Sequence, residues 1–370
     1  MKKKIMAMLF ATLLCGSLVL SGCGSTSDDT DDTETEAAED TADDTAEDAE
    51  VTYDELTLTF TTTYSEADTA GELLNYFVSY IEDASNGSIT FEIYWGGTYA
   101  ADGEELSFVG SGAVDMTMIG QSSYTDVLSL LNFPSQAGSY EEAIELMDYI
   151  TFEDETTSPL ILAQIEAQNV KMLGSTVSGS NGFCFSSEYD SLAEMAQNVL
   201  GVGMNIAAFE ACGFSVTSTM PWDYYDSLSR GVVDCGYLTI SSLLSMSIEE
   251  VCPYFYLDGT YTAGNFFTIN LDVWNAMSED TQALFEEATD ATQEFSIELC
   301  YSDDEESAET IEAAGGSLNE LSDEDKETIR TAFFQTGVED ARSYASDAGC
   351  TDEMETVLSV VSEQVGIDLE

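Results

Sequence analysis

The sequence contains no histidine and very few basic residues. Its 370 residues include 8 Lys and Arg against 72 Asp and Glu, which gives a formal net charge of −64. Without histidine, a Ser-His-Asp triad, a Cys-His pair and an HExxH zinc site are excluded. A surface this anionic repels a phosphate backbone, which argues against nucleic acid as a partner. The cysteines show no CxxC spacing and the acids no EF-hand spacing, so we expect no metal site and no cofactor.

Long apolar runs are absent except at the N-terminus. Three lysines precede an apolar run over residues 5–20, which is short for a membrane-spanning helix. The run ends in Leu20-Ser21-Gly22-Cys23, which resembles the lipobox of bacterial lipoproteins. The resemblance implies that residues 1–22 are a lipoprotein signal peptide and that Cys23 is lipidated after cleavage. We therefore expect an exported protein, lipid-anchored to the outer face of the cell membrane. The alternative is an ordinary signal peptide with an incidental cysteine.

The segment after Cys23 lacks apolar residues larger than alanine. Residues 24–50 contain only Gly, Ser, Thr, Ala, Asp and Glu, and 13 of these 27 residues are acidic. Such a segment cannot bury enough apolar surface to offset its chain entropy. We expect residues 23–52 to form an acidic, disordered tether. From position 51 on, the chain keeps 59 acidic and five basic residues.

Six cysteines follow the tether, and the sequence does not decide their state. Export permits disulfides, and six cysteines allow fifteen pairings. Several lie in apolar runs, where they would be buried thiols. The six are Cys184, Cys212, Cys235, Cys252, Cys300 and Cys350.

The remainder of the chain has the composition and pattern of an α/β protein. Hydrophobic residues make up 44% of the sequence, too many for a disordered chain. Predicted strands alternate with predicted helices in two rounds, which favours a mainly parallel sheet in each round. After residue 272 the pattern is helical to the end. The predicted strands cover residues 56–63, 88–95, 112–120, 170–173, 183–186, 199–205, 216–220, 232–238, 254–257 and 265–271.

Five segments, at residues 86–93, 106–116, 220–225, 228–234 and 268–280, resemble in the same order the DctP-type family of solute-binding proteins of TRAP transporters. Residues 228–234 (LSRGVVD) resemble the family's "aLqxGvvDg", and residues 220–225 (MPWDYY) its "mPxxevY". Residues 268–280 resemble "viNkkxWdsLpeD". Residues 86–93 and 106–116 resemble "sxGxixvxv" and "eaLqxGtvdm".

The resemblance implies a two-lobed, periplasmic-binding-protein-like α/β fold with an interlobe ligand cleft and long C-terminal helices. We expect the first part of lobe I over residues 53–174 and lobe II over residues 175–262. Residues 263–370 would supply return strands and helices that pack on both lobes. The protein would capture a small organic ligand and deliver it to the membrane subunits of a TRAP-type permease. It would not be an enzyme.

One departure from the family pattern bears on the ligand. Many members hold an organic acid through an Arg in a "GxkiRv" strand, a bidentate geometry that suits a carboxylate. The corresponding residues 197–205 contain no Arg, and Gly201 or a near neighbour stands at its position. Leu238 likewise replaces the Asn of the family's "GqeNp". Among the remaining cations, only Lys171 lies in a strand that approaches the cleft. We expect the ligand not to be a simple mono- or dicarboxylate.

Candidate ligand-binding residues follow from their places at strand ends and from the resemblance. Aromatic rings with amide and hydroxyl groups would line the cleft and orient the ligand. Core packing is the alternative for the aromatic members. The candidates are Tyr64, Gln121, Phe183, Asn205, Trp222 and Tyr237.

Two aspartates could be mistaken for a catalytic pair. Asp115 and Asp234 lie in the similar segments GAVDM and GVVDC, which form a weak internal repeat. In the family these are structural turn positions in separate lobes. Two other functions stay open: a ligand-binding module of a membrane sensor, and a surface hydrolase. A glycosidase would need two carboxylates facing one cleft at about 5–10 Å, and the strand ends offer no such pair.

Overall fold

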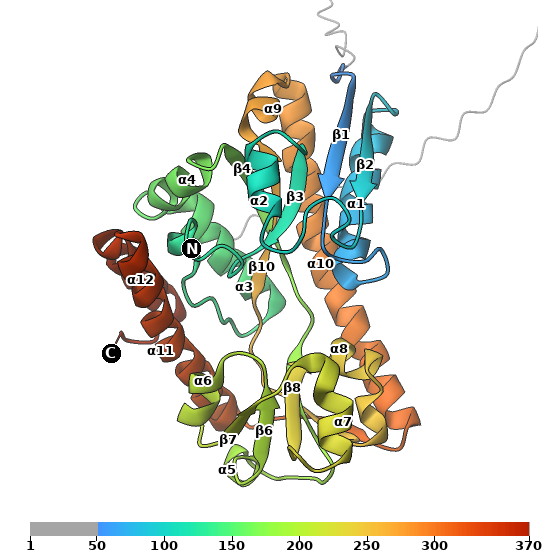
Figure 1. Ribbon diagram of the computed structural model, residues 1–370, viewed down its shortest axis with the longest axis vertical. Helices are drawn as coiled ribbons and strands as arrows, with labels where there is room; N and C mark the ends of the chain where they lie inside the picture. Colours follow the sequence, from blue (N-terminus) through green and yellow to red (C-terminus); the bar gives the residue numbers. More distant parts are fainter. Residues whose placement is uncertain (1–50, 370) are drawn as a thin grey trace, which may run out of the picture. The chain divides into compact units, whose positions relative to one another are not determined.

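Figure 1 shows the computed structural model, in which residues 51–369 are described. The expected signal peptide over residues 1–22, the lipidation site Cys23 and the tether up to residue 50 lie outside the described residues. Within residues 51–369, no helix is long and apolar enough to cross a membrane.

The described chain contains two mixed β-sheets. The first has five strands in the order β2-β1-β3-β10-β4, and the second has six in the order β11-β9-β5-β8-β6-β7. The strands of the first sheet are β1 (Leu56–Thr61), β2 (Ile89–Tyr94), β3 (Met116–Gly120), β4 (Val170–Val177) and β10 (Ala263–Asn270). Those of the second are β5 (Asn181–Phe185), β6 (Val199–Val202), β7 (Ser215–Ser218), β8 (Cys235–Thr239), β9 (Tyr254–Leu257) and β11 (Ser317–Glu320).

Helices cover both sheets (Figure 1). Those of the first lobe are α1 (Thr69–Ala84), α2 (Glu105–Gly110), η1 (Ser129–Leu131), α3 (Tyr140–Asp148), η2 (Tyr149–Glu153) and α4 (Ser158–Glu166). Those of the second lobe are α5 (Leu192–Met195), α6 (Ile206–Ala211), η3 (Pro221–Asp223), α7 (Tyr224–Ser229), α8 (Ile240–Ser245) and η4 (Ile248–Glu250). The C-terminal part forms α9 (Leu271–Ala276), α10 (Glu279–Ala313), α11 (Asp323–Ala348) and α12 (Thr351–Val365).

The first β-α-β unit shows how local sequence produces these elements. Helix α1 buries residues at helical spacing, including Leu74, Phe77 and Ile81, against the first sheet. Asn86 and Gly87 both have positive φ and turn the chain directly into β2. Strand β2 then pairs in parallel with β1 along its whole length. The right-handed β-α-β connection rule explains why the helix returns over the sheet.

Four pieces of the chain connect the two lobes. Residues 178–180 link β4 to β5, and residues 258–262 link β9 to β10; we call these the crossing segments. Helix α10 contacts α1 and β4 of the first lobe and α8 and β11 of the second, and Figure 1 shows it passing both sheets. Helix α11 contacts α6 in the second lobe and η1 in the first. The predicted two-lobed α/β fold with long C-terminal helices is confirmed.

Two details of the strand prediction are corrected. Both sheets are mixed: β10 is antiparallel to β3 and β4, and β5 is antiparallel to β8 and β9. The first sheet therefore has as many antiparallel as parallel pairings, and only the second has more parallel ones. Strands β5 and β10 both follow a crossing segment and enter the middle of a sheet from the opposite direction. Strand β11 was not predicted, because its four residues, three of them polar, lie between two long helical patterns and pair only at the sheet edge with β9.

The two predicted turn aspartates have the structural role expected of them. Asp115 precedes β3, and its Oδ2 accepts bonds from the Thr59 N–H and the Thr59 hydroxyl, both at 2.7 Å. Asp234 precedes β8, and its Oδ2 accepts a bond from the Val199 N–H at 2.9 Å. Each carboxylate therefore joins the start of one strand to the neighbouring strand of its own sheet.

Candidate functional site

A cavity of about 570 Å³ lies where the ends of strands from both sheets come together. In α/β sheets, ligands bind beyond the carboxyl ends of the strands. The cavity fits this rule, because its walls come from the ends of β1, β4 and β8, the start of β10 and helices α1 and α8. The lining residues are Tyr64, Ala67, Asp68, Thr69, Ala70, Leu73, Val177, Ser178, Gly179, Thr239, Ser241, Ser242, Ser245 and Asn265.

Tyr64 and Asn265 form the first-lobe wall of this interlobe cavity. Tyr64 follows β1, and its hydroxyl donates to Oδ1 of Asn265 on β10 at 3.0 Å. Burial raises the pKa of the Tyr64 phenol, and the charges of Glu105, Asp102 and Asp68 raise it further. The wall is therefore aromatic and polar in a negative local potential.

The N-terminus of α1 forms the next part of the wall. Asp68 is the N-cap residue, but its side chain makes no capping bond to the helix. Its Oδ2 accepts a bond from the Ser65 N–H at 2.9 Å. Thr69 lines the cavity beside it and donates to Oδ2 of Asp303 on α10 at 3.3 Å. Burial raises the pKa of Asp303, and the neighbouring charges of Glu72, Glu306 and Asp304 add to that rise. This part of the site thus has carboxylates both in the wall and behind it.

Hydroxyl groups form the second-lobe wall. Thr239 ends β8, and its hydroxyl donates to the Ser242 hydroxyl of α8 at 2.6 Å. Ser241 and Ser245 lie on the same short helix, and Ser245 donates to the carbonyl of Ser242 at 2.8 Å. These groups can donate and accept hydrogen bonds without carrying charge.

No basic side chain lines this cavity, and the five that occur within residues 51–369 all have other contacts. Lys171 lies over the Trp274 ring at 5.6 Å. Arg230 pairs with Asp226 at 3.3 Å, and Lys326 with Glu320 at 2.8 Å. The other two are Arg330, paired with Glu327 at 2.8 Å, and Arg342, paired with Glu355 at 2.7 Å.

A carboxylate lies in each region where the crossing segments pass between the lobes: Asp258 is buried and Asp304 is half-buried. Asp258 is fully buried and accepts bonds from the Tyr237 hydroxyl at 2.5 Å and the Thr260 hydroxyl at 2.8 Å. Burial raises the pKa of Asp258 to about 6, against the lowering effect of these bonds. Asp304 of α10 accepts bonds from Ser180 at 2.6 Å and Tyr140 at 2.9 Å. Both networks tie a crossing segment to its surroundings.

Of the predicted site residues, Tyr64 alone is among the residues that line the interlobe cavity. Gln121 follows β3, but its Nε2 donates to the carbonyls of Leu131 and Phe133, at 2.8 and 2.9 Å. Phe183 is 0% exposed and packs with Tyr237 in the core of the second lobe. The Tyr237 hydroxyl points to Asp258, as described above.

Asn205 and Trp222 lie beyond the ends of the neighbouring parallel strands β6 and β7 of the second lobe. Asn205 follows β6 in the left-handed conformation, with φ 57°, and begins α6. Trp222 follows β7 and is 76% exposed, and Met204 and Met220 beside these positions are 72% and 43% exposed. We call Met204, Met220 and Trp222 the apolar rim. Large exposed apolar side chains that gather at one place mark an interaction site more often than singly scattered ones do.

The strand that lacks the family's arginine has little free space on one face. A Cβ placed at Gly201 would lie 3.0 Å from Val233 Cγ2 and 3.2 Å from Thr219 Oγ1. A Cβ at Gly203 would lie 3.4 Å from Met220 Sδ, an ordinary contact distance. The surroundings of β6 are therefore packed for small residues and an apolar neighbour, and not for a guanidinium group.

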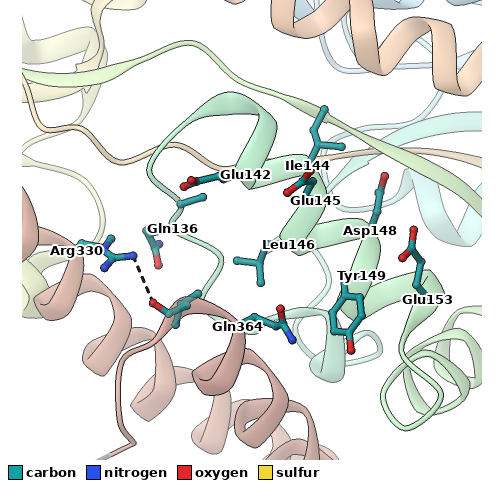
Figure 2. A pocket seen from close by; sticks show the side chains of 12 residues that line it. Gln136, Glu142, Ile144, Glu145, Leu146, Asp148, Tyr149, Glu153, Arg330 and Gln364 are labelled. Atoms are coloured by element: carbon teal, nitrogen blue, oxygen red, sulfur yellow. Dashed lines mark hydrogen bonds between the residues drawn. The ribbon is translucent and has the colours of Figure 1, made fainter. Parts of the chain in front are cut away.

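A second cavity, of about 730 Å³, lies between α3 and the C-terminal helices. Figure 2 shows Glu142, Glu145 and Asp148 on one side and Arg330 and Gln364 on the other. Arg330 Nη1 donates to the carbonyl of Val365 at 3.5 Å, which ties the two C-terminal helices together. Although this cavity is larger, no strand end of the second sheet contributes to it, so it is not the site expected for the fold.

The sequence matches one family over most of its length. The family described as "Bacterial extracellular solute-binding protein, family 7" matches residues 60–339. The chain belongs to this family. It is therefore an extracytoplasmic solute-binding protein, and the prediction that it is a receptor and not an enzyme is confirmed.

Individual relatives support the assignment. The chain is 21% identical to a solute-binding protein of Sulfitobacter sp. over 312 residues, which covers 80% of this chain and 88% of the relative. It is 33% identical over 119 residues to the ectoine-binding periplasmic protein TeaA of Halomonas elongata, which covers 30% of this chain and 34% of that protein.

Solved structures share the fold. A TRAP periplasmic solute-binding protein of Rhodobacter sphaeroides, in an apo open form, matches with a TM-score of 0.68 at 19% identity, over 84% of this chain and 99% of that one. A TRAP periplasmic solute-binding protein of Roseobacter denitrificans with bound β-D-glucuronate matches with a TM-score of 0.61 at 17% identity, over 82% and 99%. These matches show that the chain shares the fold of these two proteins.

Proposed function

We propose that this receptor binds a small organic solute in the interlobe cavity and delivers it to the membrane subunits of a TRAP-type permease. The observation that carries the proposal is the cavity of about 570 Å³, to which strand ends of both lobes contribute. This volume suits one small molecule. Lobe closure on the ligand would give the permease a loaded form to distinguish from the empty one.

We further propose that Cys23 carries the lipid anchor and that the acidic residues 23–52 tether the receptor to the membrane. The motif at residues 20–23 supports this placement. Intact-mass measurement of the membrane-extracted protein should show diacylglycerol at an N-terminal Cys23. Cys23→Ser should release the protein from the membrane without changing ligand affinity. A Cys23→Ser protein that stays in the membrane fraction would show that another feature holds it there.

The proposed contacts include Tyr64, Asn265 and Thr239 in the cavity and Trp222 on the apolar rim. The ligand would not be a simple mono- or dicarboxylate, because none of the five cations within residues 51–369 lines the cavity. An anion buried without a cation would be costly in a protein of this charge.

A thermal-shift screen of the purified protein against acids, sugars, polyols, amines and nucleosides tests the site. A true ligand raises the melting temperature by mass action, with a stoichiometry of one in calorimetry. Ser241→Trp should fill the cavity and abolish that shift, whereas the exposed Ser229→Trp on α7 should not. Ligand binding that survives Ser241→Trp would place the site elsewhere.

Delivery to a permease is the second step to test. Proteoliposomes that contain the TRAP membrane subunits of the same organism should take up the ligand only when the loaded receptor is added. Binding without stimulated uptake, together with capture of a membrane sensor, would favour the alternative of a signalling module.

A further inference from the structure

We propose that the ligand of the interlobe cavity carries a positively charged nitrogen, as an amine, a quaternary ammonium or a zwitterion, and that Asp68 contacts this group. The inference rests on the proposed function of the cavity and names the class of ligand it would take. It follows from the charges that line the cavity, from those that are absent, and from the aromatic wall.

The wall of the cavity carries negative charge and no positively charged side chain. Asp68 is the single ionisable carboxylate among the lining residues, and no lysine or arginine accompanies it. The Asp68 carboxylate accepts one bond, from the Ser65 N–H to Oδ2, and Oδ1 has no protein donor among the described contacts. Asp303 stands behind the wall through its bond with Thr69. A ligand with net negative charge would meet these carboxylates with no cation to offset them.

The remaining polar groups are neutral and suit the rest of such a ligand. The hydroxyls of Thr239, Ser241 and Ser242 can pair with a hydroxyl, an amide or a carboxylate of the ligand. The Tyr64 ring adds an aromatic surface in the same cavity. An aromatic ring attracts a cation, with a gain that grows as the pair is desolvated. Closure of the lobes would remove water from this contact.

The N-terminus of α1 in the cavity wall favours an anion, and this limits the class of ligand. Ala67 to Ala70 at the N-terminus of α1 line the cavity, and the positive end of a helix attracts negative charge. Asp68 stands at this end as the N-cap and offsets it. A ligand carboxylate could therefore be accommodated only when a cationic group on the same molecule faces Asp68. Zwitterions are compatible with this arrangement, and dicarboxylates are not.

The test uses the purified protein and four sets of probes. Glycine betaine, choline and putrescine represent the proposed class, succinate the dicarboxylates, galactitol the polyols and galactose the sugars. Melting temperature and calorimetric Kd are measured for each probe and then for a wider set built on any that bind. At least one compound with a cationic nitrogen should bind at one site per chain.

Asp68→Asn should weaken that binding by about tenfold or more, since it removes a charge-assisted contact. Glu66→Gln is the matched control: it removes the same charge two residues away, outside the cavity lining, and should change affinity less than about twofold. Higher salt should weaken binding in the parent more than in Asp68→Asn.

The inference is overturned if every binder is neutral or anionic, if no compound with a cationic nitrogen binds, or if Asp68→Asn and Glu66→Gln have equal effects. These results are separate from a failure of the proposed function. A polyol that binds and is lost in Ser241→Trp would overturn the ligand class and keep the site. A cationic ligand that still binds Ser241→Trp would overturn the site itself.

Discussion

The turn before β3 in the first lobe and the turn before β8 in the second are built alike, whereas the opposite ends of these two strands differ. Gly112 and Gly231 have φ of 72° and 66°, and a buried valine and then an aspartate follow two and three residues later. Each aspartate accepts the N–H of a neighbouring strand, Thr59 or Val199. The same short sequence pattern thus forms the same kind of turn before one strand in each lobe.

At the other end the two lobes diverge. After β3, Gln121 uses its amide to hold the carbonyls of Leu131 and Phe133. After β8, Thr239 and the serines of α8 leave their hydroxyls in the wall of the cavity. The comparison separates two kinds of residue. Those at the two strand starts stabilise the fold, whereas the strand ends line the cavity only in part: Thr239 does so, and Gln121 instead holds two backbone carbonyls. The predictions below test this division.

The largest effect is expected at Asp258, a strand-end residue with a structural role. Its pKa of about 6 in the folded protein lies above the value of about 3.9 in an unfolded chain. The folded state therefore binds more protons between these values, and the free energy of unfolding falls as pH rises from about 4 to about 6. The difference corresponds to about 3 kcal/mol at pH 7. Asp258→Asn should reduce this slope in chemical denaturation.

Tyr237→Phe is the companion variant for Asp258. It removes a hydrogen bond that lowers the pKa of Asp258, so it should extend the pH-dependent loss of stability to higher pH. An Asp258→Asn protein with the parent slope would show that half-buried acids with raised pKa, such as Asp148 and Asp304, account for the pH dependence.

Substitution of either turn aspartate should destabilise the fold, by a larger amount at Asp115 than at Asp234. Asp115→Ala removes two hydrogen bonds and should cost about 2 kcal/mol of unfolding free energy. Asp234→Ala removes one bond at a more exposed position and should cost about 1 kcal/mol. Urea denaturation measures both. Neither variant should change ligand affinity. If affinity falls in a variant that is still folded under the assay conditions, the strand starts contribute to binding and the division between strand starts and strand ends is wrong.

Trp222→Ala should do the opposite: it should lower ligand affinity and leave the unfolding free energy almost unchanged. Because the side chain is 76% exposed, its loss should change the unfolding free energy by less than about 0.5 kcal/mol. Ligand affinity should fall about tenfold, equivalent to about 1.4 kcal/mol. The exposed Tyr99→Ala of the first lobe is the control and should leave Kd unchanged. Unchanged affinity in Trp222→Ala would remove the apolar rim from the site.

The smallest effect concerns the two turn glycines, and it should be the same in both lobes. No atom lies near a Cβ built at Gly231, and at Gly112 the nearest is Asn270 Nδ2 at 3.9 Å. The cost of Gly→Ala is therefore that of the left-handed backbone alone, about 1 kcal/mol in each case. Gly231→Asn should cost less than Gly231→Ala, because Asn tolerates this conformation better. Unequal costs for Gly112→Ala and Gly231→Ala would show that the two turns differ in energy although their backbone geometry is alike.

The sequence predicted elements well where local pattern and turn residues agreed. Strands β1 and β2 begin and end within about two residues of their predicted bounds, because their sequence pattern is local and the turn at Asn86-Gly87 sets the start of β2. Strand β4 continues four residues beyond its predicted end, since Gly174 interrupts the apolar pattern while its position in the sheet is set by pairing with β10. The direction of β10 and β5 depends on the crossing segments and has no local sequence pattern.

The candidate site was predictable in part for the same reason. Reasoning from strand ends gave Tyr64, which lines the cavity. It did not give Asp68, Ser241 or Ser242, because acidic and hydroxyl residues on helices are usually solvent-facing. Their role arises only when α1 of one lobe and α8 of the other meet across the cavity, an arrangement set by tertiary packing.

Helix α10 adds a mechanical element to this receptor. It has 35 residues, about 50 Å of continuous helix, and contacts both lobes. Any change in the angle between the lobes must bend this helix or slide it along one lobe, so it acts as an elastic strut. Part of the work of opening and closing is then stored in a helix that does not itself line the cavity. Softening the exposed position Ser302 with glycine should shift the balance of open and closed forms, measurable by energy transfer between labelled lobes, while every contact to the ligand stays in place.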